Sequence, residues 1–168
     1  MGVTFRGESL HKVDSKGRVS IPAGFRRVLE AGDPDCSPGQ PPRVAVAYGD
    51  RSGRRLECFT IDEMNALGAR IRSLPRKDPR REPLTELYVR NVVELTLDDN
   101  GRIVLGQALR APFAIAGEAR FVAELDHFEI WSPEKYAEKQ ARIETVLEEM
   151  DEADDPLALL DDVPDPEA

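Results

Sequence analysis

DSKGRVSIP (residues 14–22) is matched further along the chain by DDNGRIVLG (residues 98–106). Asp, Gly and Arg are identical in the two stretches, and the two apolar positions that follow the arginine also match. In each stretch the glycine allows a tight turn, because it adopts positive φ without the steric cost of a side chain. Asn-Gly in the second stretch is a strong hairpin signal. Each stretch therefore predicts a hairpin turn between two short strands.

The residues around these stretches predict an internal repeat. LECFT (residues 56–60) resembles FEIWS (residues 128–132), and the two pairs of matches come in the same order. The extra residues of the first copy fall in the Gly- and Pro-containing stretches 32–42 and 49–53, which are typical of loops. In each copy we expect a strand, the turn, a second strand, a short helix, two more strands and a longer helix. The expected strands cover 9–13, 18–21, 44–48 and 56–59 in the first copy and 92–97, 102–105, 119–125 and 128–131 in the second.

Several residues mark the ends of the expected helices. Thr60 begins a capping box, and Ser132-Pro133 provides an N-cap followed by proline at the first helical position. The last helix should cover 134–150, while Pro112 should end the second short helix early. The first short helix should bury one apolar face, made of Phe25, Val28 and Leu29.

Charge is unevenly distributed along the chain. The net charge is −9, yet residues 144–168 contain eleven acidic residues and no Lys or Arg. The rest of the chain is therefore mildly basic, with basic excess in 1–30 and 68–92. A block of like charge is usually solvated and disordered. We expect a basic body with an acidic tail that acts mainly in solubility.

The sequence contains no convincing catalytic or metal-binding motif. It lacks the phosphate-binding, dinucleotide-binding and His-Glu-x-x-His patterns. His11 and His127 are far apart and are expected to be ordinary histidines, and Cys36 and Cys58 lack metal-ligand spacing. We therefore expect no enzyme activity, no cofactor and no metal. The absence of an apolar run of ~18 residues and of an apolar signal core predicts a cytoplasmic protein with no membrane contact.

The two Asp-x-x-Gly-Arg turns are the remaining candidates for function. A structural explanation suffices for one such turn, because the aspartate can cap it and pair with the arginine. A functional explanation is that Arg18 projects from a two-stranded ribbon into the DNA major groove, where arginine pairs with guanine O6 and N7. Lys16 stands where the second turn has Asn100, and Ser15 where it has Asp99. The first turn is thus more cationic and is the expected base-reading element.

These motifs resemble the MraZ family, within the SpoVT/AbrB-like swapped-hairpin group of bacterial DNA-binding proteins. The resemblance covers roughly residues 3–142. It is carried by FRG (5–7), by DSKGRVSIP with Phe25-Arg26, by Asp98-x-x-Gly101-Arg102 and by FEIWS (128–132). Two features depart from the family. Leu105-Gly106 replaces its usual Ile-Pro, and the resemblance does not extend to the acidic tail.

The resemblance implies a transcriptional regulator that forms a ring-like homo-oligomer. It implies binding to short G-rich direct repeats in the promoter of the division and cell-wall gene cluster, including the protein's own gene, and so a nucleoid-associated location. The family's Asp-x-x-x-Arg motif falls on Asp14/Arg18 and Asp98/Arg102. The expected DNA-binding residues are Lys16, Arg18, Ser15, Gly17, Arg6 and Arg102, and the residues expected to orient the turns are Asp14, Asp98 and Gly101.

The expected fold is α+β, with two tandem AbrB-like swapped-hairpin modules, rich in β-strand and flanked by short helices, that form a pseudo-symmetric double-repeat domain. The first module covers 3–73, a basic Pro-rich linker 74–87 and the second module 88–143. The acidic tail, 144–168, is expected to be disordered. An alternative function is an antitoxin-like interaction module that uses the same turns while its tail binds another protein.

Overall fold

The structure is a computed structural model that describes residues 4–150 and 155–167. Residue 3, where the first predicted module begins, and residues 151–154 and 168 of the predicted tail lie outside the described residues. The chain divides into two compact units, Met1–Lys135 and Tyr136–Ala168. The first unit contains the strands, and the second contains most of the last helix and a short helical turn.

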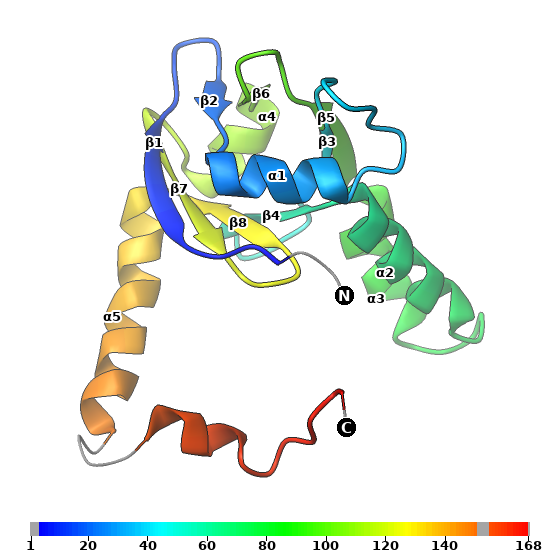
Figure 1. Ribbon diagram of the computed structural model, residues 1–168, viewed down its shortest axis with the longest axis vertical. Helices are drawn as coiled ribbons and strands as arrows, with labels where there is room; N and C mark the ends of the chain where they lie inside the picture. Colours follow the sequence, from blue (N-terminus) through cyan, green and yellow to red (C-terminus); the bar gives the residue numbers. More distant parts are fainter. Residues whose placement is uncertain (1–3, 151–154, 168) are drawn as a thin grey trace. The chain divides into compact units, whose positions relative to one another are not determined.

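The fold is α+β, as predicted, and its strands form two antiparallel sheets (Figure 1). The larger sheet contains β1 (Glu8–Lys12), β3 (Arg43–Ala47), β4 (Arg55–Phe59), β5 (Val92–Thr96), β7 (Glu118–Ala123) and β8 (Phe128–Trp131). Their order is β1-β7-β8-β4-β3-β5. The smaller sheet pairs β2 (Arg18–Ser20) with β6 (Arg102–Val104). The predicted strand bounds differ from these by at most two residues.

The prediction that each turn joins two paired strands is wrong. β1 pairs with β7, β5 pairs with β3, and β2 pairs with β6. The physical reason is burial, because Val19 of β2 lies opposite Ile103 of β6 and both side chains are buried in the core. Four strand pairs, namely β1–β7, β2–β6, β3–β5 and β4–β8, therefore join residues 3–73 to residues 88–143.

The helices begin and end close to where the sequence predicts. Thr60 Oγ1 accepts a hydrogen bond from the backbone N–H of Glu63 at 3.0 Å, which confirms that Thr60 is the N-cap of this helix. Ser132 Oγ caps the last helix, and the second short helix ends before Pro112. The helical segments are α1 (Ala23–Ala31), α2 (Ile61–Ser73), α3 (Arg81–Thr85), the π-helical η1 (Glu86–Arg90), α4 (Gln107–Arg110), the 3-10 turn η2 (Ala111–Phe113), α5 (Pro133–Glu149) and the 3-10 turn η3 (Pro156–Leu160).

Two predicted segments contain helical structure. The predicted linker, 74–87, contains α3 and the start of η1. The predicted tail begins inside α5, which continues to Glu149, and it also contains η3. None of the helices among the described residues is long and apolar enough to cross a membrane.

The larger sheet packs apolar side chains on both of its faces at its inner strands β3 and β4. Successive side chains of a strand point to opposite faces, so Val44 and Val46 of β3 pack in the main core while Ala45 and Ala47 pack in a second one. The main core also contains the predicted apolar face of α1, Phe25, Val28 and Leu29. The second core lies against α2, with Ile61, Met64 and Leu67. The smaller sheet packs into the main core through Val19 and Ile103.

We predict that Gly17→Ala destabilises the protein more than Gly7→Ala does. Both glycines have positive φ, +83° and +90°, so an alanine at either position is strained, which costs roughly 1–3 kcal/mol. At Gly17 a Cβ would also lie 2.2 Å from the carbonyl oxygen of Leu105, whereas at Gly7 no atom lies within 4 Å. Urea unfolding of the two variants measures the difference, and equal losses would contradict the tight packing at Gly17.

Candidate nucleic-acid interface

One carboxylate organises the first turn, residues 14–18. Asp14 Oδ1 accepts hydrogen bonds from the backbone N–H groups of Lys16 and Arg18, both at 2.9 Å, and its Oδ2 accepts one from Arg18 Nε at 2.6 Å. The backbone N–H of Gly17 donates to the Asp14 carbonyl at 3.0 Å and closes the turn. The hydrogen bond from the Arg18 backbone, supported by the others, lowers the pKa of the Asp14 carboxyl. The carboxylate therefore remains ionised and orients Arg18.

The second turn, residues 98–102, has the same internal bonding. Asp98 Oδ1 accepts from the backbone N–H groups of Asn100 at 2.8 Å and Arg102 at 3.0 Å, and Oδ2 accepts from Arg102 Nε at 3.0 Å. Gly101 closes the turn by donating to the Asp98 carbonyl at 3.0 Å. The pKa of Asp98 is also lowered, chiefly by the Arg102 backbone hydrogen bond.

The two turns are bonded to each other through the β2–β6 pair. The Gly17 carbonyl accepts from the backbone N–H of Leu105 at 2.7 Å, and the Gly101 carbonyl accepts from Ile21 at 2.9 Å. The residue after β6 therefore bonds to the first turn, and the residue after β2 bonds to the second turn. Figure 1 shows both loops projecting from the same edge, above α1. Five of the six predicted DNA-binding residues lie in these turns.

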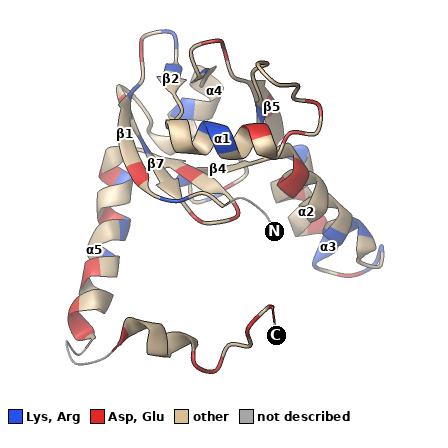
Figure 2. Ribbon diagram, viewed as in Figure 1, with Lys and Arg blue, Asp and Glu red and all other residues tan. Residues whose placement is uncertain are grey.

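The two turns differ in charge, which Figure 2 shows at the top of the view. Lys16 is exposed, and its ammonium has no hydrogen-bond or ion-pair partner among residues 4–150 and 155–167. The second turn carries Asn100 at that position and an exposed Asp99 beside it. Arg18 and Arg102 are similarly accessible, with 38% and 32% of their side chains exposed. The first turn is therefore the more favourable of the two for an anionic ligand.

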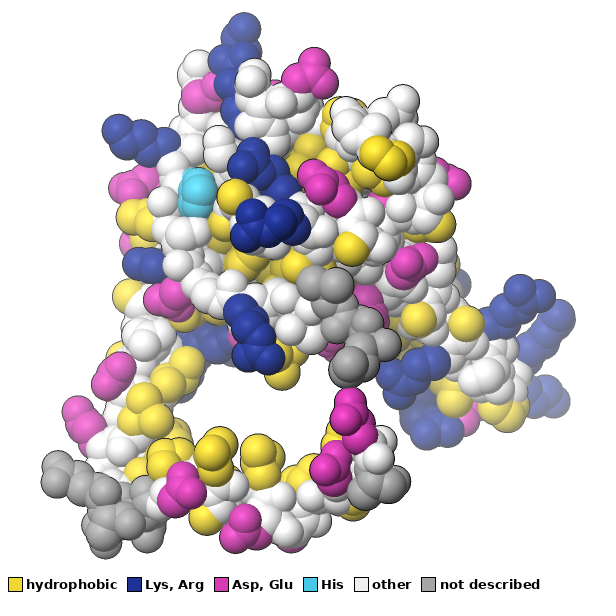
Figure 3. All heavy atoms as spheres, in the orientation of Figure 1, with side chains coloured by type: hydrophobic (Ala, Val, Ile, Leu, Met, Phe, Trp, Pro, Cys, Tyr) yellow, Lys and Arg dark blue, Asp and Glu magenta, His cyan; other side chains and the backbone are white. Residues whose placement is uncertain are grey.

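Two arginines of α1 extend the basic surface, although neither was in the predicted set. Arg27 is exposed, and Arg26 Nη1 donates to the Asn100 carbonyl of the second turn at 3.4 Å. Figure 3 shows Lys and Arg side chains from the tip of the first turn down across α1. Both arginines line a cavity of about 960 Å³ between α1, the loop 36–42 and the second turn. The sequence signal for them was their position on α1 outside its apolar face.

Arg6 is the predicted DNA-binding residue that the structure separates from the turns. The adjacent Phe5 is buried, donates from its backbone N–H to the Leu125 carbonyl at 2.8 Å, and packs edge-on against Phe25 and Phe128. These contacts place Arg6 before the start of β1, whereas the first turn follows the end of β1. A strand advances about 3.3 Å per residue, so the five residues of β1 keep Arg6 far from Lys16.

A second basic surface lies on α2, α3 and the loop between them (Figures 2 and 3). Its cations without a side-chain partner among the described residues are Arg70, Arg72, Arg76 and Lys77. Arg80 instead pairs with Asp78 at 2.7 Å, and Arg81 donates to the Leu74 carbonyl at 2.6 Å. The basic stretch was visible in the sequence, but its position away from the turns was not.

We predict that the melting temperature falls in the order parent, Asp14→Asn, Asp14→Ala. Asparagine keeps an oxygen for the backbone N–H groups of Lys16 and Arg18 but loses the charge that binds the Arg18 side chain. Alanine loses all three hydrogen bonds of the carboxylate. Asp99→Ala is the matched control, because Asp99 is an exposed aspartate of the second turn with no side-chain partner among the described residues. A similar loss for Asp99→Ala would contradict this role of Asp14.

Comparison with known proteins identifies relatives along nearly the whole chain. A family model described as "MraZ protein, putative antitoxin-like" matches residues 89–156. Proteins named "Transcriptional regulator MraZ" from Ruegeria sp. (strain TM1040) and Ruegeria pomeroyi are 46% and 44% identical to this chain over 162 residues, which is 96% of this chain and 97% of each relative. The protein of that name from Desulforapulum autotrophicum is 33% identical over 144 residues, or 86% of this chain and 90% of the relative. The chain therefore belongs to the MraZ family.

Proposed function

We propose that this protein is a DNA-binding transcriptional regulator whose first turn contacts base edges in the major groove. The observation that carries the proposal is the arrangement of Lys16 and Arg18, two accessible cations at the tip of a turn that Asp14 holds rigid. The turn is backed by the β2–β6 ribbon, and the major groove admits a two-stranded ribbon. The names of the MraZ relatives support the regulatory role.

Arg18 is the residue that we assign to base recognition. Its Nε is bound to Asp14, and its two terminal amino groups have no partner among the described residues. Those two groups are the donors that pair side by side with O6 and N7 of guanine. The bond to Asp14 also limits the rotamers of Arg18, so less conformational entropy is lost on binding.

Lys16 and Arg27 are assigned to the phosphate backbone. Both are exposed cations without partners in the described part of the chain, and Figure 3 shows the basic surface of the first turn and α1 on one face. Phosphate contacts position the protein without discriminating sequence. Ser15 and Gly17 complete the tip, and Arg102 contributes from the second turn. Arg6 is assigned no direct role at this tip.

We further propose a pseudo-symmetric double repeat with modules at 3–73 and 88–143, a joining segment at 74–87 and an acidic tail at 144–168. The equal bonding of the Asp14 and Asp98 turns supports this organisation. We propose that the protein acts at the nucleoid as a ring-like homo-oligomer. Its sites would be G-rich direct repeats in the promoter of the division and cell-wall cluster that includes its own gene, as the resemblance implies.

We predict that Arg18→Ala, Lys16→Ala and Arg102→Ala have three different effects on DNA binding. Arg18→Ala should lose roughly 1–3 kcal/mol of discrimination at one guanine while the fold persists. Lys16→Ala should weaken all sequences evenly and reduce the salt slope by about 1, as the loss of a phosphate contact does. Arg102→Ala, beside the acidic Asp99, should alter stability or assembly more than base preference.

Binding of each variant to matched and mismatched promoter DNA across a salt series, together with thermal unfolding, measures these effects. Arg18→Lys is the matched control, because it keeps the charge and loses the paired donors. If Arg18→Ala binds the promoter like the parent while Arg102→Ala does not, the base-reading turn is the second one. If none of the three variants changes DNA binding, the proposed interface is wrong.

We predict that several direct repeats bind much more tightly than one. One turn contacts few base pairs, and an oligomer raises the effective concentration of each further turn once the first is bound. Titration of DNA carrying one, two or three repeats at fixed length and fixed salt tests this expectation. Equal affinity per molecule for one and several repeats would contradict an oligomer that binds them together.

A further inference from the structure

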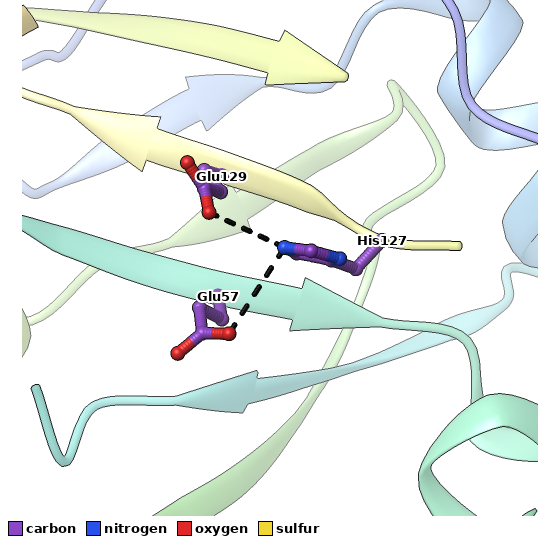
Figure 4. Close-up of side chains that lie close together, drawn as sticks. All are labelled: Glu57, His127 and Glu129. Carbon is purple, nitrogen blue, oxygen red and sulfur yellow. Dashed lines mark hydrogen bonds and ion pairs between the residues drawn. The ribbon is translucent and has the colours of Figure 1, made fainter. Parts of the chain in front are cut away.

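A group of carboxylates and a histidine lies on the larger sheet, outside the turns. Glu57 of β4 and Glu129 of β8 are direct partners across the two strands. His127, immediately before β8, points its ring between them (Figure 4). His127 Nε2 lies 3.3 Å from Glu129 Oε2 and 4.0 Å from Glu57 Oε2. The three side chains are mostly buried, with 17%, 6% and 15% exposed for His127, Glu129 and Glu57.

The other ring nitrogen sets the orientation of His127. Nδ1 lies 2.6 Å from Asp126 Oδ1, and the ring stacks on Phe59 with 5.1 Å between ring centroids. A carboxylate at Nδ1 holds the proton on that nitrogen, so the neutral imidazole directs the lone pair of Nε2 toward the two glutamates. Histidines that bind metals almost always donate their other ring N–H to a carboxylate, a carbonyl or a water in this way.

Neighbouring donors hold each glutamate in place. Tyr88 Oη donates to Glu57, with contacts of 3.1 Å to Oε1 and 3.3 Å to Oε2. Trp131 Nε1 donates to Glu129 Oε1 at 3.0 Å, and Arg55 Nε donates to Glu129 Oε2 at 2.9 Å. The two carboxylates are therefore fixed before any ligand arrives, which reduces the entropy lost when one binds.

The distances leave room for an ion shared by the three side chains. Strong hydrogen bonds between a cationic nitrogen and a carboxylate are about 2.7–2.9 Å long, shorter than both contacts of Nε2. Two ligands at about 2.1 Å from one zinc ion are about 3.4 Å apart at the tetrahedral angle and at most about 4.2 Å apart. The observed 4.0 Å lies between these two values, and the observed 3.3 Å lies just below the tetrahedral one.

The negative net charge of the group also favours the binding of a cation. Glu57, Glu129 and Asp126 oppose Arg55, so the group is doubly negative when the imidazole is neutral. Without an ion, burial lowers the pKa of His127, but hydrogen bonds to Glu129 and Asp126 outweigh it and raise the pKa to about 9. A proton and a metal ion would therefore compete for Nε2 of His127.

We propose that Glu57, His127 and Glu129 bind a divalent transition-metal ion such as Zn²⁺, with water completing its coordination. One imidazole and two carboxylates form an accepted ligand set for this ion. Because Glu57 comes from the first half of the chain and the other two from the second, the bound ion joins β4 to β8 and stabilises the fold. This site would be independent of the DNA-binding turns.

The test is thermal unfolding and calorimetric titration of the chelator-treated full chain with ZnCl₂. We expect one ion per chain, bound at these residues, and a melting temperature that rises with zinc concentration. His127→Lys should fold, because its ammonium keeps a cation between the carboxylates, but should lose the zinc-dependent rise. Asp126→Asn should bind zinc about 10–100-fold more weakly. His11→Ala is the matched control and should respond to zinc like the parent.

Two outcomes would overturn the proposal. The first is a parent protein whose melting temperature does not change with zinc, which would leave the proton as the occupant of the group. The second is an equal zinc response in the parent and His127→Lys, which would place the ion elsewhere, such as on the acidic residues of 144–168.

Discussion

The pairing of β2 with β6 is the constraint on which the rest of the first unit depends. It buries Val19 against Ile103 and bonds each turn glycine to the end of the other ribbon strand. Because the Gly17 carbonyl binds Leu105 and the Gly101 carbonyl binds Ile21, the two turns cannot move independently. A side chain at Gly17 would meet the Leu105 backbone, so the tight approach of the two strands requires glycine there.

Strand pairs between the two halves of the chain hold the first unit together. β1–β7, β3–β5 and β4–β8 all join residues 3–73 to residues 88–143 within one sheet. The two cores lie on opposite faces of this sheet, as the alternation of Val44, Ala45, Val46 and Ala47 shows. The β4–β8 register also sets Glu57 opposite Glu129, so the proposed ion would act on a contact that already holds the halves together.

The two turns have the same internal hydrogen bonds but different charges. Asp14 and Asp98 make matching hydrogen bonds, which is a structural requirement of the turn and says nothing about a ligand. The free ammonium of Lys16, against Asn100 and Asp99 in the second turn, is the reason why we propose the first turn for DNA reading. Exposed ion pairs of this type contribute little to stability, so the Asp14–Arg18 pair is better explained by orientation of the guanidinium.

The sequence by itself determined the features that depend on neighbouring residues. The Asp-x-x-Gly-Arg turns join residues four apart, and the Thr60 cap, the Ser132 cap and the end of α4 before Pro112 are equally local. The strand bounds followed from apolar runs and turn residues. Tertiary structure alone decided the strand partners, because a strand's pattern specifies which face is buried but not which strand lies beside it. For the same reason it separated Arg6 from the turns, brought Arg26 to Asn100, and placed Glu57 beside His127, a residue of the other half of the chain.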